Sequence, residues 1–192
     1  MNRRALPRWS LIAALSALTL AAATASLLFG AVDLSVTRLI AAATGDGDMV
    51  ASVILFDLRL PRTLLALAVG AMLGLAGAAL QGYLRNPLAE PSVLGTSNAA
   101  ALGGVAAIYF GLADIHPVVL PLLATGGALV SLALLFVLAG KAESPLTLIL
   151  AGIAVGTLAV AGTSLALNLS PNPFAAMEIM TWLLGSLENR SF

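Results

Sequence analysis

The chain has 192 residues, of which 60% are hydrophobic and 9% charged. An average soluble domain carries about 25% charged residues, so this composition excludes an ordinary soluble fold. Nine basic and nine acidic residues give a net charge of zero, which gives no indication of nucleic-acid binding. The chain has no cysteine and only one histidine, His116. Disulfides and thiolate sites are therefore excluded, and we expect no metal centre and no cofactor.

The apolar residues form runs long enough to cross a bilayer, which takes about 20 residues per helix. The first run, 9–30, is uncharged and follows Arg3, Arg4 and Arg8. A cleavable signal peptide is the alternative, because the Ala-Thr-Ala at 23–25 resembles a cleavage site. The apolar region of a signal peptide is usually about 7–15 residues long, so the length of this run favours a retained span.

Four more uncharged runs follow, separated by short loops. They lie at 63–82, 93–113, 118–139 and 146–169. Short loops make neighbouring helices antiparallel. Long apolar runs joined in this way predict an all-α fold. We expect a polytopic transmembrane helical bundle of about five spans, forming a single domain over 1–192.

Two further segments are predicted to be short helices at the membrane surface. Val36–Ala43 is weakly amphipathic and lies within the more polar stretch 31–58. The tail at 178–192 is too short and too charged to span, and it contains Trp182, a residue type enriched at membrane interfaces. We expect the tail to be an interfacial helix on the outer side.

Lys and Arg near the span ends indicate the orientation. With the N-terminus inside, the inner side holds five basic residues and the outer side four. The inner ones are Arg3, Arg4, Arg8, Arg85 and Lys141, and the outer ones Arg38, Arg59, Arg62 and Arg190. This weak bias, together with the three arginines before the first span, favours a cytoplasmic N-terminus.

The run 146–169 combines small and polar residues, and polar side chains within a span usually face protein or water. The candidates for lining a pathway are Gly152, Gly156, Thr157, Thr163, Ser164 and Asn168. Alternatively, the glycines only let helices approach closely, and the hydroxyls bond back to their own helix. Both interpretations remain open on the sequence.

The spans carry no Asp, Glu, Lys, Arg or His. Ion and proton relays usually need such residues, so proton-coupled transport within this chain is disfavoured. The chain also lacks the G-x-x-x-x-G-K-[ST] phosphate loop. We therefore expect no enzyme, and a transport cycle would take its energy from a partner.

The stretch 59–104 carries the most specific pattern. It contains RLPR at 59–62, a glycine-rich run ending in Gln81, RNPLAEP at 85–91 and LGTSNAAALGG at 94–104. Two more pieces follow later in the chain: LILAGIAVG at 148–156 and WLLGSL at 182–187. In this order and spacing, the pieces resemble the FecCD-type permeases of ABC importers, which take up iron-siderophore complexes, haem or vitamin B12.

The resemblance implies a passive pathway in the bacterial inner membrane, as half of a permease homodimer. It also implies ABC ATPase subunits on the cytoplasmic side and an extracytoplasmic substrate-binding protein. Iron-siderophore transport ranks first because it is the commoner task in this family. In the family, the run corresponding to 146–169 borders the pathway.

Arg59 and Arg62 flank Pro61, which suits the first turn of a helix. Cations at a helix N-terminus oppose the helix dipole, which suggests a partner that supplies carboxylates. The resemblance assigns both arginines to docking of the substrate-binding protein. The alternatives are snorkelling to lipid headgroups and a pair between Arg59 and Asp57.

The turn after the second span contains Arg85, Asn86, Pro87 and Glu90. Asn86 is a good helix cap and Pro87 a good first helical residue, so a rigid cytoplasmic turn is the plain interpretation. The alternative is that this turn contributes to the surface facing the ATPase.

Members of the resembled family have ten spans, whereas this sequence stops at Phe192. We therefore expect either a fragment or a truncated gene product, with about five of the ten spans present. A non-transporting membrane scaffold or assembly partner is the rival hypothesis to a permease.

Overall fold

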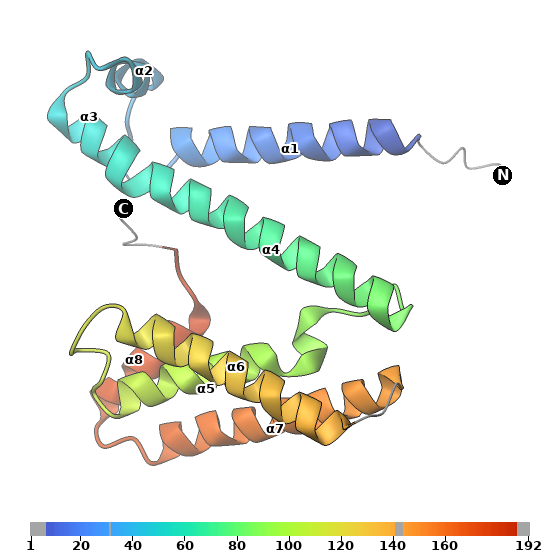
Figure 1. Cartoon of the computed structure of the whole chain (residues 1–192). Coiled ribbons are helices and arrows are strands. Elements are labelled where there is room, and N and C mark those ends of the chain that lie inside the picture. Colours follow the sequence, from blue (N-terminus) through green and yellow to red (C-terminus); the bar gives the residue numbers. More distant parts are fainter. Residues whose placement is uncertain (1–6, 31, 141–143, 188–192) are drawn as a thin grey trace. The chain divides into compact units, whose positions relative to one another are not determined.

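The computed structural model describes residues 7–30, 32–140 and 144–187 (Figure 1). All regular elements within these ranges are helices. Their contacts divide them into two compact units, one built on the residues before Met72 and the other on Met72–Ser186.

Four helices of the described residues are long and apolar enough to cross a membrane. They are α1 (Arg8–Leu28), the continuous helical stretch Met49–Leu84, α6 (Val119–Ala139) and α7 (Pro145–Asn168). The prediction of an all-α polytopic bundle is confirmed, and its count of about five spans is roughly consistent with these four helices and one shorter helix.

The shorter helix, α5 (Thr96–Tyr109), occupies the predicted third span. A 3-10 turn, η2 (Pro91–Leu94), precedes it, and Gly95 separates the two with a φ of 70°. The segment predicted as a span over 93–113 therefore contains a shorter helix, because the left-handed conformation at Gly95 interrupts it. The 14 residues of α5 extend about 21 Å.

The first unit contains the expected short helix as α2 (Val36–Thr44), followed by α3 (Met49–Val53). The Ser35 side chain caps α2, which ends at Gly45 in the left-handed conformation. The Asp48 carboxylate accepts a hydrogen bond of 2.7 Å from the Ala51 N–H, which caps α3. Asp48 also forms an ion pair with Arg38, so one carboxylate joins the two short helices.

Protonation of Asp48 is expected to loosen this link at low pH. The hydrogen bond from the Ala51 N–H and, after it, the Arg38 side chain hold the pKa of Asp48 below its usual range. Because the folded state lowers this pKa, the stabilisation is present above the ordinary aspartate pKa of about 4 and is lost as pH falls through the lower folded value.

Amide hydrogen-exchange protection at Ala51 measures this effect. Protection should be lower in Asp48→Ala than in the parent at pH 6, and the difference should shrink as pH falls below about 4. Asp46→Ala, two residues away, is the matched control. Equal protection in Asp48→Ala and Asp46→Ala would show that the cap does not hold α3.

The predicted second span belongs to one helical stretch that begins far upstream. It consists of α3, the π-helical turn η1 (Ile54–Arg59) and α4 (Leu60–Leu84). Within η1, the N–H of Leu60 bonds to the carbonyl of Leu55, five residues back. Pro61 therefore lies inside a helix, not at its start, and our placement of Arg59 and Arg62 at a helix N-terminus was wrong.

The π-helical turn explains how the helix tolerates this proline. Pro61 has no N–H to offer the carbonyl of Asp57, and in a regular α-helix its ring would clash with that carbonyl. The wider turn just before it relieves the crowding. With Pro61 in place, the helix thus continues through a π turn, a possibility that the sequence interpretation omitted.

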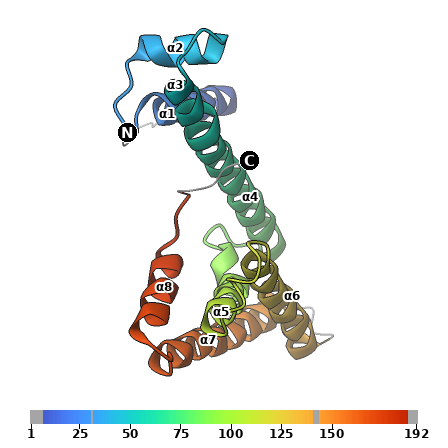
Figure 2. The ribbon, with the colours of Figure 1, turned by 90° about the vertical axis from the view of Figure 1, so that its left-hand side faces the viewer.

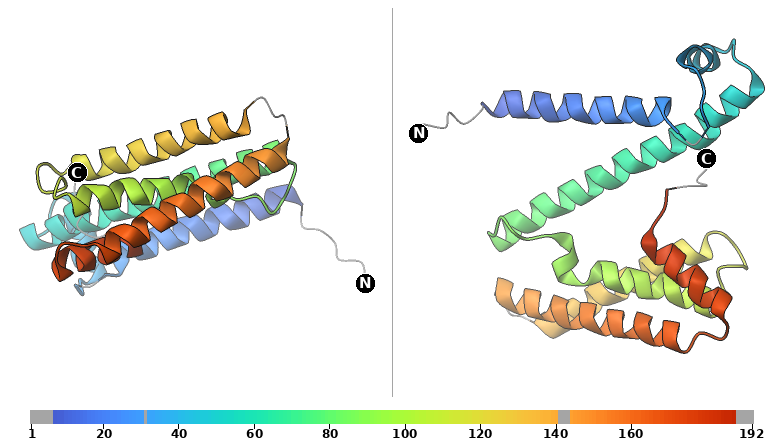
Figure 3. Two further views of the ribbon diagram at one scale, coloured as in Figure 1. Left: turned by 90° about the horizontal axis from the view of Figure 1, so that it is seen from below. Right: turned by 180° about the vertical axis from the view of Figure 1, so that it is seen from behind.

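The second unit has α5 at its centre. Figures 2 and 3 show α5, α6 and α7 lying side by side, with α8 (Pro173–Leu184) also against α5. Val105 and Ile108 of α5 form a buried cluster with Ile179 of α8. The ring of Trp182 fills the space left by Gly104, where a Cβ would lie 2.2 Å from the ring.

The helix expected at 178–192 differs in its bounds. It begins at Pro173 and ends at Leu184, after which Gly185 has a φ of 74°. Residues 188–192 of that prediction lie outside the described residues. Ile179 is completely buried, so one face of α8 packs against protein.

Candidate functional site

Helix α7 presents two different faces, because successive residues of an α-helix are rotated by about 100°. Gly152, Gly156 and Thr163 share one face, which packs against protein: the two glycines are buried and Thr163 is half-buried. Thr157, Ser164 and Asn168 share the other face and are exposed. The six candidates from the sequence therefore do not form one surface.

The two buried glycines allow α7 to contact the chain around Gly95. A Cβ on Gly152 would lie 2.6 Å from the Val93 carbonyl oxygen, and one on Gly156 would lie 3.0 Å from the Gly95 Cα. A Cβ on Gly95 would in turn lie 2.5 Å from the Gly152 carbonyl oxygen. The three glycines thus form a backbone-to-backbone contact, and close packing explains Gly152 and Gly156 directly.

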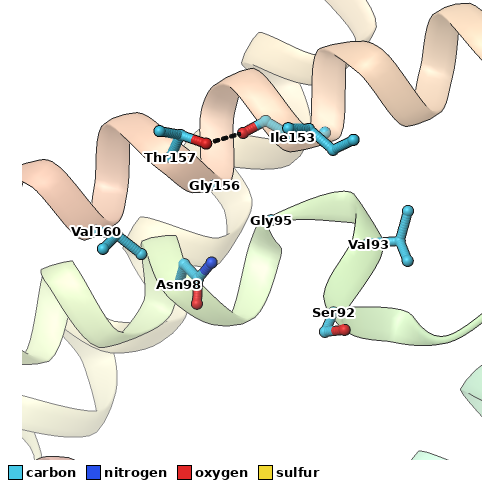
Figure 4. Close-up of a pocket in the computed structure, with 9 residues that line it drawn as sticks. Ser92, Val93, Gly95, Asn98, Ile153, Gly156, Thr157 and Val160 are labelled. Atoms are coloured by element: carbon cyan, nitrogen blue, oxygen red, sulfur yellow. Dashed lines mark hydrogen bonds between the residues drawn. The ribbon is translucent and has the colours of Figure 1, made fainter.

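A pocket of about 280 Å³ opens beside this contact, between η2, the first turn of α5 and the middle of α7 (Figure 4). It is lined by Ser92, Val93, Gly95, Asn98, Gly152, Ile153, Gly156, Thr157 and Val160. No lining residue is charged. The polar groups are the side chains of Ser92, Asn98 and Thr157, so the pocket suits a neutral polar or amphipathic surface.

The polar side chains around the pocket are arranged locally. Thr157 donates a hydrogen bond of 2.7 Å to the Ile153 carbonyl, which leaves its oxygen lone pairs toward the surroundings. The Asn98 amide lies close to Gly156, where a Cβ would be 3.2 Å from its Nδ2 atom. The sequence interpretation missed Ser92 and Asn98, although Asn98 is a polar residue at the start of an apolar run.

The other three candidates on α7 lie away from this pocket. Asn168 donates a hydrogen bond of 2.8 Å to the Ser164 carbonyl, so its amide is tied to its own helix at the C-terminal end of α7. Thr163 and Ser164 do not line the pocket. Of the pathway candidates, the structure therefore brings Gly152, Gly156 and Thr157 together and separates Thr163, Ser164 and Asn168 from them.

The turn after α4 is built around Arg85 and Asn86. Arg85 has a φ of 48°, and the Asn86 N–H bonds back to the Gln81 carbonyl at 3.1 Å. The Asn86 side chain accepts a hydrogen bond from the Leu88 N–H at 2.9 Å. Asn86 therefore forms an Asx turn and does not cap a following helix as expected.

The rest of this turn is exposed apart from Ala89. Arg85, Asn86, Pro87 and Glu90 are exposed, whereas Ala89 is only 6% exposed and anchors the loop. Glu90 accepts a hydrogen bond from the Ser92 hydroxyl. The next helical turn begins at Pro91, four residues later than we expected from Pro87.

The two arginines of the RLPR segment have different environments. Arg59 is only 6% exposed, and its guanidinium donates hydrogen bonds to the carbonyls of Leu27, Leu28 and Val32. Arg62 is half-buried. The alternative pair between Arg59 and Asp57 does not form, because the Arg59 guanidinium points to the end of α1.

The arrangement of helices is similar to that of a solved ABC transporter. A solved structure described as an inward-facing conformation of a proposed metal-chelate type ABC transporter matches 95% of the chain with a TM-score of 0.81 and 34% identity. The match covers 55% of that chain. The helices described above therefore have the fold of an ABC-transporter permease.

Sequence comparison identifies the family. The FecCD transport family matches residues 18–192. The Fe(3+) dicitrate transport system permease protein FecD of Escherichia coli is 42% identical over 139 residues, which are 72% of this chain and 42% of FecD. The vitamin B12 import system permease protein BtuC of Salmonella newport is 40% identical over 130 residues, 68% of this chain and 40% of BtuC.

The chain belongs to the FecCD transport family. It spans about two fifths of the length of these curated relatives, 42% of FecD and 40% of BtuC.

Proposed function

We propose that the chain acts as a membrane-spanning permease subunit of an ABC importer for an iron chelate. The observation that carries this proposal is the 42% identity to FecD, a permease for Fe(3+) dicitrate, within the family match over 18–192. Cobalamin is the substrate alternative supported by the 40% identity to BtuC, and haem is an alternative on the family resemblance alone.

The proposal includes the arrangement in the membrane. The two units together form one permease domain, embedded in the bacterial inner membrane with a cytoplasmic N-terminus and paired with a second copy. The exposed turn with Arg85, Asn86, Pro87 and Glu90 then faces the cytoplasm, where ATPase subunits supply the energy. The exposed face of α7 with Thr157, Ser164 and Asn168 borders the pathway.

Reconstituted transport tests the function. The permease is placed in proteoliposomes with its ATPase and its substrate-binding protein, and ATP-dependent accumulation of labelled iron(III) citrate, an iron(III) siderophore, haem and cobalamin is measured. We expect an iron chelate to accumulate. Accumulation of cobalamin or haem alone would overturn the iron assignment only, whereas no accumulation by an ATP-hydrolysing complex would overturn the permease proposal.

Docking of the substrate-binding protein is proposed at the RLPR segment, where Arg59 ends η1 and Arg62 lies in the first turn of α4. Because Arg59 is only 6% exposed and Arg62 is half-buried, Arg62 is the more accessible candidate to meet a carboxylate of the binding protein. Arg62→Glu is expected to weaken docking by about tenfold or more, since a like-charge contact replaces an ion pair. Surface plasmon resonance on nanodiscs at two salt concentrations measures it.

The control for this experiment is Arg85→Glu, a charge reversal at an exposed arginine in the turn after α4. Its affinity for the binding protein should stay near that of the parent. Unchanged docking in Arg62→Glu, at low as well as high salt, would remove Arg62 from the interface.

A further inference from the structure

The C-terminal end of α1 has backbone carbonyls that its own sequence does not satisfy. The last four carbonyls of a helix lack intrahelical partners, and α1 has no basic residue in its last turn. Phe29, the residue after α1, is extended. No residue of α1 is fully buried, and Ser26, Leu27 and Leu28 at its C-terminal end are half-buried.

Arg59, from the helical stretch Met49–Leu84, satisfies two of these carbonyls. Its Nη1 atom donates hydrogen bonds of 2.9 Å to the carbonyls of Leu27 and Leu28, and its Nη2 atom donates one of 2.6 Å to Val32. A cation at a helix C-terminus is favoured by the helix dipole. The planar guanidinium fork can reach several acceptors at once, which an ammonium group cannot.

Gly30 leaves room for this arrangement. A Cβ at position 30 would lie 3.0 Å from both the Nε and the Nη2 atoms of Arg59. The guanidinium therefore passes close to the backbone of the segment that leaves α1.

A second polar contact lies one helical turn further along. The hydroxyls of Ser26 and Thr63 are 2.8 Å apart. Thr63 donates its one hydroxyl hydrogen to the Arg59 carbonyl at 2.8 Å, so Ser26 is the donor between the two hydroxyls. Thr63 is 4% exposed, which makes this a contact shielded from water.

The π-helical turn η1 aligns these side chains with the buried face of α3. In an uninterrupted α-helix, Arg59 would be rotated by about 80° from Ala51, and Thr63 by about 120°. A π turn accommodates about one additional residue, which turns the later positions back by about 100°. Ala51, Ile54, Arg59 and Thr63 then share one face, and all four are buried.

We infer that Arg59 is the C-terminal cap of α1, supplied by the helical stretch Met49–Leu84 and brought into register by the π turn at 54–59. Together with the Ser26–Thr63 contact, it forms a clamp that fixes the end of α1 to the start of α4. The first arginine of the RLPR segment thus has an intramolecular task, separate from the docking task proposed for Arg62.

Disulfide trapping tests the clamp, because these 192 residues include no cysteine. Ser26→Cys with Thr63→Cys should form a disulfide rapidly under mild oxidation in membranes. The matched control is Thr24→Cys with Thr63→Cys, because Thr24 is an exposed residue of the same helix whose hydroxyl bonds to Leu20. This pair should cross-link slowly.

The clamp variants are then compared in the Ser26→Cys/Thr63→Cys background. Arg59→Gln should slow disulfide formation by about tenfold or more, because charge-assisted hydrogen bonds are lost. Arg59→Lys should recover only part of the rate of disulfide formation. Gly30→Val should slow disulfide formation although Arg59 is intact. Arg62→Gln should leave the rate unchanged. Parental rates in both Arg59→Gln and Gly30→Val would overturn the inference.

A rescue measurement separates loss of the clamp from general misfolding. When Arg59→Gln is combined with Ser26→Cys/Thr63→Cys, the oxidised disulfide should restore the melting temperature toward that of the parent, since it replaces the lost attachment. Failure of the disulfide to restore any stability would contradict the clamp. Loss of binding-protein docking in Arg59→Gln at a parental cross-linking rate would instead assign Arg59 to docking.

Discussion

Gly127→Ala is expected to disrupt the packing of α6 on α5, whereas Gly126→Ala, one residue earlier in the same helix, is expected to be tolerated. A Cβ at Gly127 would lie 2.3 Å from the Ala99 carbonyl oxygen and 3.3 Å from the Gly103 Cα. At Gly126, no heavy atom of the described residues lies within 4 Å of the added Cβ. The two variants therefore add the same methyl group in opposite surroundings.

The cost is large because the colliding atoms belong to the backbone. Side chains can rotate away from an added methyl group, but relief at Gly127 requires α6 to move away from α5. Gly103 makes the reciprocal contact, where a Cβ would lie 2.2 Å from the Leu123 carbonyl oxygen. We expect Gly127→Ala to cost about 3 kcal/mol or more, and Gly126→Ala to gain up to about 1 kcal/mol from helix propensity.

Thermal unfolding in detergent, followed by size-exclusion chromatography, measures the difference. The melting temperature of Gly127→Ala should fall well below that of the parent, and that of Gly126→Ala should equal or exceed it. Equal melting temperatures for the two variants would mean that the close approach of α5 and α6 is not formed.

The second large effect is expected at Gly95, where backbone conformation and crowding act together. Gly95 has a φ of 70°, which side chains rarely adopt. Its added Cβ would also lie 2.5 Å from the Gly152 carbonyl oxygen and 2.6 Å from the Gly156 N atom. Gly95→Ala should therefore displace α7 from η2 and destroy the pocket between them.

Gly111 provides a control that separates the two causes. Its φ of 66° is nearly the same, but no heavy atom of the described residues lies within 4 Å of an added Cβ. Gly111→Ala should lower the free energy of unfolding by about 1–2 kcal/mol, through the strained backbone conformation alone. Gly95→Ala should lose that contribution and the packing of α7.

Labelling at the pocket measures the second effect directly. The thiol of Thr157→Cys should react with a water-soluble maleimide at a different rate in Gly95→Ala, because the wall formed by η2 has moved. In Gly111→Ala, the rate should stay at that of the parent. The same rate in all three proteins would show that Gly95 does not set the distance between η2 and α7.

The apolar runs predicted the existence of the long helices, because a membrane-spanning helix needs about 20 mostly apolar residues. They did not predict the helix bounds at 49–63, since Pro61 normally marks a helix start and only the π turn before it allows the helix to continue. They also did not predict the break at Gly95, because a glycine in an apolar run is compatible with a helix or a turn.

The roles of single residues depended on contacts between distant segments. Gly152 and Gly156 had two interpretations on the sequence, and only their contact with Val93 and Gly95 identifies the packing role. Arg59 could not be linked to Leu27 and Leu28 from spacing, because about thirty residues with no regular pattern separate them. Local sequence patterns therefore predicted the helices, whereas the hydrogen-bond partners of polar groups could be identified only from the folded structure.

The shortness of α5 has a consequence for the membrane itself. A hydrocarbon layer is about 30 Å thick, whereas the 14 residues of α5 extend about 21 Å. The remaining depth along this element falls to η2 and Gly95, where peptide groups lie outside a continuous α-helix. Such backbone is tolerated at that depth only where protein covers it or water reaches it. Gly95 is buried against Gly152 and Gly156 of α7, so packed protein covers the break in the helix there.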